Sequence, residues 1–135
     1  MSWDVGIVDT FGQLSRYYGL ATVVFIGGSL IPHGGQNPLE AASLGKPILF
    51  GPFMHNFQEI AYQLVTYKAA QQLTDRSALR AALERCLRHP EEAQAMGRRA
   101  QALTAQFQGA TQRTLEALQL FLKPRVALTP PSSTT

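Results

Sequence analysis

A chain of 135 residues with 45% hydrophobic residues is long enough for one domain with its own core, and this composition excludes disorder along the whole chain. The single cysteine, Cys86, excludes an internal disulfide and a cysteine-rich metal site. No apolar run reaches the roughly 18 residues that a membrane-spanning helix needs.

The formal net charge of +3 is unevenly distributed along the chain. Residues 1–75 carry three basic and five acidic residues, a net charge of −2, whereas residues 76–135 carry nine basic and four acidic residues, a net charge of +5. A basic half can lie against nucleic acid or anionic lipid, or can simply be a solvated helix surface. Because no aromatic residues are interleaved with these arginines, we expect no nucleic-acid partner.

Residues 4–73 alternate between apolar runs and helix-like segments. The apolar runs predict strands at 4–8, 22–26, 47–50 and, more weakly, 70–73. The segments between them predict a helix from Phe11 to Tyr18, capped by Asp9 or Thr10 and ended by Gly19, then a short helix ended by Gly45, and another over 56–67. This order predicts an α/β fold with a Rossmann-like parallel sheet.

The pattern after Asp75 is helical throughout. An amphipathic helix is predicted over 75–89, and Pro90 begins a second helix that runs to about Gln108. Gly109 is predicted to break the pattern before a last helix with Leu115, Leu118 and Leu122. Residues 1–122 are therefore interpreted as one domain, followed by a flexible Pro/Ser/Thr-rich tail over 123–135.

A sheet with three or four strands leaves much of its edge uncovered, so the chain is interpreted as part of a larger sheet, with a small autonomous domain as the alternative. In such sheets ligands bind at the carboxyl ends of the strands. Gly27-Gly28 and Gly51-Pro52 both follow predicted strands, so two loops are expected at one edge.

The loop from Gly27 to Glu40 carries the strongest local signal. Gly34 and Gly35 can form a nest of backbone N–H groups for an anion, and Asn37 is a good N-cap with Pro38 at the first helical position. Glu40 stands three residues after Asn37, so it can close a capping box, or its two acceptor oxygens can bind ribose hydroxyls.

Three further polar residues near these loops have two interpretations each. His33 can contact a ligand or be solvent-exposed, and Ser29 can bind a phosphate or satisfy the turn. Asn56, which follows His55, can flank a ligand or cap the next helix. Three scattered histidines do not predict a metal site, and no arrangement of residues predicts a catalytic nucleophile, so neither a metal nor a cofactor is expected.

Several segments occur together in one order that resembles a known family. They are Asp9-Thr10-Phe11-Gly12-Gln13-Leu14, Tyr18-Gly19-Leu20-Ala21, Phe25-Ile26-Gly27-Gly28-Ser29-Leu30, Gly34-Gly35-Gln36-Asn37-Pro38-Leu39-Glu40, Gly45-Lys46-Pro47-Ile48-Leu49-Phe50-Gly51-Pro52, Asn56-Phe57 and Glu59-Ile60. Together they resemble the C-terminal part of 3-deoxy-D-manno-octulosonic acid (Kdo) transferases. The resemblance covers most of residues 4–122 and is most specific over 25–60.

The resemblance implies the C-terminal domain of a GT-B glycosyltransferase, which binds the donor CMP-Kdo. The enzyme then transfers Kdo to a lipid A precursor at the cytoplasmic face of the bacterial inner membrane, in lipopolysaccharide biosynthesis. It further implies that Glu40 holds the ribose of the donor. The other implied donor-binding residues are those near the phosphate (Gly34, Gly35, Gln36, Asn37), those lining the pocket (Gly27, Gly28, Ser29) and those flanking it (Gly51, Pro52, His55, Asn56). His33, in the same glycine-rich loop, is a further candidate contact with the substrate.

The chain also departs from the family. Gln36 stands where a histidine is common. The family's catalytic base, acceptor groove and membrane anchor belong to an N-terminal half that has no match here, so this chain is expected to bind donor but to be inactive alone, with acceptor and membrane contacts made through that half. The last helix would then present an exposed leucine face, which favours self-association. The alternatives are a GT-B enzyme that uses a UDP-sugar and a stand-alone nucleotide-binding module.

Overall fold

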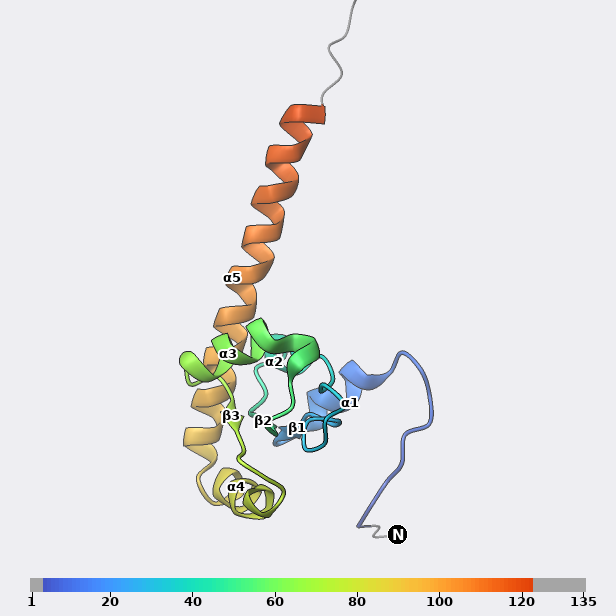
Figure 1. Ribbon diagram of the computed structural model, residues 1–135, viewed down its shortest axis with the longest axis vertical. Helices are drawn as coiled ribbons and strands as arrows, with labels where there is room; N and C mark the ends of the chain where they lie inside the picture. The colour runs from blue at the N-terminus through green and yellow to red at the C-terminus, as the bar shows by residue number, and fades with distance from the viewer. Residues whose placement is uncertain (1–3, 123–135) are drawn as a thin grey trace, which may run out of the picture.

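Three short strands form one parallel sheet at the centre of the molecule (Figure 1). The computed structural model describes residues 4–122. The strands are β1 (Val24–Phe25), β2 (Ile48–Phe50) and β3 (Gln71–Gln72), and they lie in the order β1-β2-β3. Val24 is in register with Ile48, and Leu49 with Gln71. The predicted parallel sheet is thereby confirmed, with strands shorter than the apolar runs suggested.

Helices precede, connect and follow the strands. They are α1 (Leu14–Leu20), α2 (Leu39–Ser43), the 3-10 turn η1 (His55–Phe57), α3 (Gln58–Thr66), α4 (Ser77–Arg88) and α5 (Pro90–Leu122). The helix α2 connects β1 to β2, and η1 with α3 connects β2 to β3. Parallel strands require such crossovers, which is why the strands and helices alternate along the chain.

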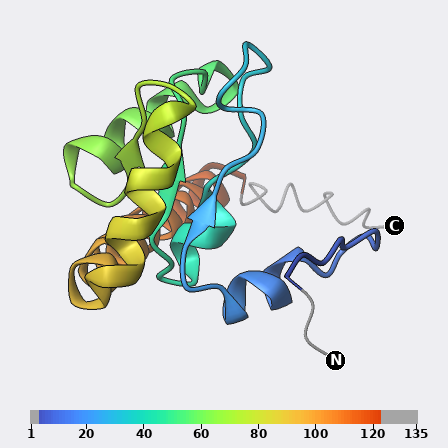
Figure 2. The ribbon, with the colours of Figure 1, turned by 90° about the horizontal axis from the view of Figure 1, so that it is seen from below.

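Both faces of the sheet are covered. On one face, Val24, Ile48 and Phe50 pack against buried residues of α2, α3 and α5, including Ala42, Leu64 and Leu103. On the other face, Leu49 packs with Leu73 and with residues of α4 and the start of α5, including Cys86 and Ala93. Alternate residues of β2 point to opposite faces, so the continuous apolar run Ile48–Phe50 is what a sheet covered on both sides requires. Figure 2 shows these helices around the sheet.

The long helix α5 corrects one prediction. It is continuous over 33 residues, about 50 Å at the usual rise, and its second half extends away from the sheet (Figure 1). Gly109 does not break it, because one glycine in a helix costs only about 1 kcal/mol and good helix formers stand on both sides. Nearer its start, buried Gly97 packs directly on the backbone of Gly45, where a Cβ would overlap the carbonyl oxygen.

The strand predicted over 4–8 is wrong. Residues 4–10 have no regular secondary structure, and their apolar side chains are exposed, with Ile7 at 90% exposure. The apolar alternation is present, but none of the other described residues pairs with this segment, and a strand forms only where a neighbouring edge accepts its hydrogen bonds.

The first helix and the helix boundaries differ in smaller ways. The helix α1 begins at Leu14 rather than at 11, its N-cap is Gln13 without a side-chain hydrogen bond, and Gly19 lies inside it. The capping roles predicted for Asp9 and Thr10 are therefore wrong, since both residues precede the helix by several positions. The predicted tail over 123–135 lies outside the described residues. Within residues 4–122, no helix combines the length and the apolar character that crossing a membrane demands.

Candidate functional site

The glycine-rich loop after β1 folds back on itself. The N–H of Gly35 donates to the carbonyl oxygen of Gly28 (3.1 Å), and the N–H of Gln36 donates to that of Gly27 (3.2 Å). Gly28, Gly34 and Gly35 all have positive φ, between 70° and 103°, a region that side chains with a Cβ rarely adopt. The backbone conformation of the loop therefore favours glycine at these three positions.

This loop is joined to the loop after β2 by a set of hydrogen bonds. The Ser29 hydroxyl accepts from the Gly51 N–H (2.8 Å), and the Ser29 carbonyl oxygen accepts from the Phe53 N–H (2.9 Å). Further along, the Asn56 N–H donates to the Gly34 carbonyl oxygen (3.1 Å). The prediction that both loops meet at the carboxyl edge of the sheet is therefore confirmed by their contacts.

Asn56 connects the loops and does not cap a helix. Its side-chain amide donates to the carbonyl oxygen of His33 (3.3 Å), and α3 begins after Phe57 without a side-chain cap. Its side chain also lies directly against Gly34, so that a Cβ on Gly34 would overlap it. The capping interpretation of Asn56 is wrong, and its position beside the glycine loop agrees with the other interpretation.

The start of α2 lies one residue later than predicted: Pro38 is the N-cap, with helical dihedral angles and no side-chain cap, and α2 begins at Leu39. Asn37 precedes the cap, and its side-chain oxygen still accepts from the N–H of Leu39 (3.0 Å), one of the donors that the first turn leaves without a partner. The exposed side chains of Gln36 and Asn37 flank the buried ring of Pro38.

The proposed anion nest is partly occupied by the fold itself. The N–H groups of Gly35 and Gln36 are both used within the loop, as given above. Within the described part of the chain, the N–H groups of Gly34 and Asn37 have no hydrogen-bond acceptor. An anion at this loop would therefore be bound by fewer backbone donors than the sequence suggested.

Glu40 does not close a capping box. Its carboxylate accepts a hydrogen bond from the Ser15 hydroxyl of α1 (3.3 Å) and not from the N–H of Asn37. The phenol of Tyr18 is partly buried beside it, and burial together with the negative charge of Glu40 raises the pKa of Tyr18 above its usual value. Glu40 is exposed on the first turn of α2, so its carboxylate is accessible to a ligand.

The two histidines of the predicted site are both exposed. The His33 ring lies over Gly28, where a Cβ would approach it to 3.0 Å. His55 lies on η1 and lines a groove. Among the described residues, no group of three histidine, cysteine or carboxylate side chains is arranged to hold a metal ion.

A groove of about 730 Å³ opens beside the loop after β2. Pro52 and His55 line it, together with residues of α3 that were not predicted as site residues: Gln58, Glu59 and Tyr62. Glu59 belongs to one of the segments that carry the family resemblance, whereas Gln58 and Tyr62 were marked only by their position just after a loop at the carboxyl edge. The predicted residues of the glycine loop do not line this groove, although hydrogen bonds hold that loop against the same segment.

Comparisons with known proteins identify relatives over most of the chain. No family model matches it. The chain is 42% identical over 120 residues, 88% of its length, to a 3-deoxy-D-manno-octulosonic acid transferase of Bordetella pertussis, and 34% identical over 119 residues to that of Haemophilus influenzae. It spans 28% of the length of each of these relatives.

A solved structure resembles the fold as well. The crystal structure of the C-terminal CMP-Kdo binding domain of WaaA from Acinetobacter baumannii matches with a TM-score of 0.65 and 34% identity. The match covers 69% of this chain and 49% of that one. Sequence and fold therefore agree that the chain belongs to the 3-deoxy-D-manno-octulosonic acid transferase family, as a part that corresponds to a C-terminal domain.

Proposed function

We propose that this chain is the donor-binding part of a Kdo transferase, a GT-B glycosyltransferase, and that residues 1–122 form this part. The observation that carries the proposal is its 34% identity and shared fold with a domain described as binding CMP-Kdo. The whole enzyme would transfer Kdo from CMP-Kdo to a lipid A precursor during lipopolysaccharide biosynthesis. No metal or other cofactor is needed for the roles assigned to these residues.

We infer that the donor lies across the two loops at the carboxyl edge of the sheet. The exposed carboxylate of Glu40 has two acceptor oxygens, and Ser15 binds one of them, so the other can accept from ribose hydroxyls. The free N–H groups of Gly34 and Asn37 belong to the same loop that leads to Glu40 and would face the phosphate. Gly27, Gly28 and Ser29 would support this surface, and Gly51, Pro52, His33, His55, Gln36 and Asn56 would border it.

The chemistry also requires a base that activates the acceptor hydroxyl. No residue of this chain matches the family's base, so we propose that this chain positions the donor and stabilises its phosphate, while the base and the acceptor groove belong to another part of the enzyme. We place the whole enzyme at the cytoplasmic face of the inner membrane, with its membrane contacts outside this chain. The purified chain is expected to show no transfer with CMP-Kdo and acceptor.

Nucleotide titration tests the donor role. We expect CMP to bind the purified chain more tightly than UDP, measured for both by amide chemical shifts. Glu40→Gln keeps the size of the side chain and removes its charge, and should weaken CMP binding about tenfold, because hydrogen bonds to a charged acceptor are the stronger ones. Glu91→Gln, an equal charge change at an exposed position of α5, should leave the affinity unchanged. Equal binding of UDP, or an unchanged affinity in Glu40→Gln, would contradict the proposal.

The leucine face of α5 supports a second, weaker proposal on assembly. Leu115 and Leu118 are each 49% exposed on the part of the helix that extends from the body. We propose that this face drives self-association of the chain when nothing else covers it. Sedimentation should show a concentration-dependent dimer that the variant Leu115→Gln/Leu118→Gln loses, and a monomer at every concentration would contradict this.

A further inference from the structure

A second cavity, of about 670 Å³, lies along β3 between this edge strand and the two helices that follow it. It extends beside the residues from Lys68, just before β3, to Gln72 at its end. No residue of the glycine loop or of the segment 51–56 lines it. Val65 and Gln72 line both this cavity and the groove beside His55, so the two are neighbours on one side of the molecule.

The charges around this cavity are predominantly positive. Lys68, Arg85 and Arg99 line it, and among the described lining residues Glu92 is the one carboxylate. The formal charge of the lining is therefore +2 before His89 is counted. A concave site lined mainly by one sign of charge concentrates ions of the opposite sign.

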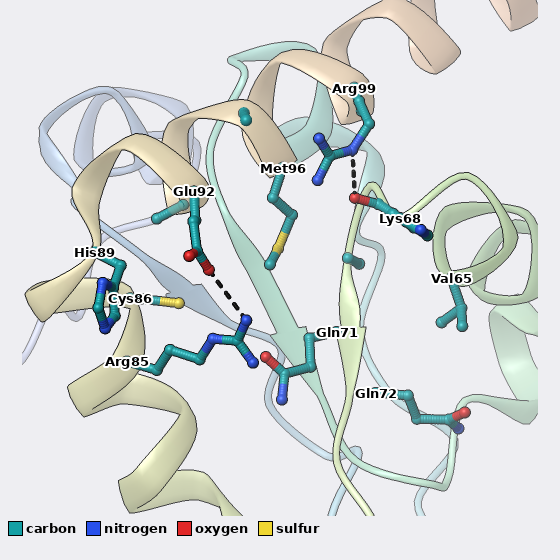
Figure 3. A pocket seen from close by; sticks show the side chains of 13 residues that line it. Val65, Lys68, Gln71, Gln72, Arg85, Cys86, His89, Glu92, Met96 and Arg99 are labelled. Atoms are coloured by element: carbon teal, nitrogen blue, oxygen red, sulfur yellow. Dashed lines mark hydrogen bonds and ion pairs between the residues drawn. The ribbon is translucent and has the colours of Figure 1, made fainter.

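The guanidinium groups of Arg85 and Arg99 each donate one hydrogen bond within the protein. The Arg85 Nη2 donates to the Glu92 carboxylate (3.0 Å), and the Arg99 Nε donates to the Lys68 carbonyl oxygen (2.7 Å). Figure 3 shows both contacts, with Arg85 on α4 and Arg99 on α5 at opposite sides of the cavity. A guanidinium has five N–H donors in a fixed plane, so each group is oriented and still has donors available.

The remaining lining residues favour a small organic molecule as the ligand rather than a bare ion. Met96 points between the two arginines in Figure 3, and Ala70, Ala93 and Val65 add apolar surface. Gln71 supplies an amide on the same side as Arg85. The volume lies within the range of small-molecule sites, which are mostly apolar with a few oriented polar groups.

We propose that this cavity binds a phosphate-bearing molecule, whose phosphate is held by the remaining N–H donors of Arg99 while Met96 contacts its apolar part. Two N–H donors of one guanidinium can bind two oxygens of a phosphate at once. A phosphate monoester is therefore the ligand class that this lining fits. The chain's own residues 123–135 have the wrong charge to occupy it, since they carry Lys123 and Arg125 and no acidic residue. The inference does not depend on the proposed donor role.

A titration of the full chain with glycerol 3-phosphate tests the site. At constant ionic strength, with chloride as the control salt, we expect saturable amide shifts centred on residues 68–72 and 85–99. Arg99→Gln should weaken binding at least about tenfold, because a charge-assisted contact is lost. Arg99→Lys keeps the charge but not the planar donor pair. Its affinity for glycerol 3-phosphate should therefore lie between that of the unaltered chain and that of Arg99→Gln.

The matched control is Arg113→Gln, an equal charge change at an exposed position of the same helix and outside the cavity. It should bind glycerol 3-phosphate like the unaltered chain. A parallel arm uses vesicles that contain phosphatidic acid. If the chain binds these vesicles, and if Arg99→Gln weakens this binding while Arg113→Gln does not, the result would also support the phosphate site. It would then assign the site to a lipid headgroup. Shifts centred on residues 27–40, equal losses in Arg99→Gln and Arg113→Gln, or no binding in either arm would overturn the proposal.

Discussion

The hydroxyl of Ser29 accepts a hydrogen bond from the backbone N–H of Gly51 at 2.8 Å and donates to the carbonyl oxygen of Ile26, and both Ser29 and Gly51 are buried. One side chain therefore joins the loops after β1 and β2, which are 22 residues apart in sequence. The candidate donor surface depends on the relative position of these two loops, so this contact is structural support for it.

Removing this hydroxyl should destabilise the fold. Ser29→Ala leaves the buried N–H of Gly51 without an acceptor, which costs about 1–3 kcal/mol of unfolding free energy. Urea unfolding followed by circular dichroism measures the loss. Thr66→Ala is the control, because its hydroxyl bonds a carbonyl oxygen at an exposed position of α3 and its removal should cost less. Equal losses in the two variants would show that Ser29 has no special role.

The glycine loop should reject a side chain at Gly34 and tolerate one at Gly27. Gly34→Ala places a Cβ at a φ of 103° and against the side chain of Asn56, so we expect a loss of at least about 1 kcal/mol. Gly27→Ala adds the same atom where φ is ordinary and no neighbour lies within 4 Å. Thermal unfolding of both variants compares them, and a stability of Gly34→Ala equal to that of Gly27→Ala would contradict the loop geometry.

Alkaline pH should weaken the contact between α1 and α2 through Tyr18. Burial and the charge of Glu40 raise the pKa of Tyr18, so the unfolded chain loses this proton at a lower pH than the folded chain does. The stabilising contribution is therefore complete below the ordinary tyrosine pKa of about 10 and is lost as the pH rises through the folded value.

The measurement is the melting temperature at pH 8 and near pH 10.5 for the unaltered chain and for Tyr18→Phe. The variant keeps the ring but has no phenol to ionise, so its melting temperature should fall less with pH. Tyr17→Phe removes an exposed neighbouring phenol and should behave like the unaltered chain. Identical pH dependence in all three chains would rule out Tyr18 as the cause.

Cys86 should react slowly with alkylating reagents in the folded chain. It is 5% exposed, and burial raises the pKa of its thiol more than the neighbouring Arg85 lowers it. Since the thiolate is the reactive form, we expect iodoacetamide at pH 8 to modify the native chain at least about tenfold more slowly than the urea-unfolded chain. The chain has one cysteine, so mass spectrometry reads the reaction directly. Equal rates would indicate that the α4–α5 packing around Cys86 opens readily.

Replacing Gly109 should stabilise α5. The helix is continuous through this residue, and a Cβ there would make only an ordinary contact with Arg113 at 3.5 Å. Gly109→Ala should therefore raise helical content and add about 0.5–1 kcal/mol of stability, while Ala105→Gly, at an exposed position of the same helix, should remove a similar amount. Circular dichroism with thermal unfolding tests both changes. A loss of stability in Gly109→Ala would instead support the helix break at Gly109 that the sequence predicted.

Sequence spacing by itself determined the features that depend on neighbouring residues. The order of β1, α2, β2, α3 and β3, the loops at the carboxyl ends of β1 and β2, and the hydrogen bond from the Leu39 N–H to the Asn37 side chain all follow from local hydrogen bonding and apolar periodicity. The family resemblance over 25–60 was also readable from these residues, and the relatives confirm it.

Tertiary structure decided which partner each group found when more than one was available. Glu40 binds Ser15, 25 residues away, rather than the nearby N–H of Asn37, and Asn56 binds His33 rather than capping α3. The apolar residues 4–8 form no strand, because their own pattern cannot supply a neighbouring edge. The basic cavity likewise arises only when Arg99 reaches the carbonyl of Lys68, 31 residues earlier. Local propensities fix what a segment can form, whereas the packing of distant segments fixes which of those possibilities is realised.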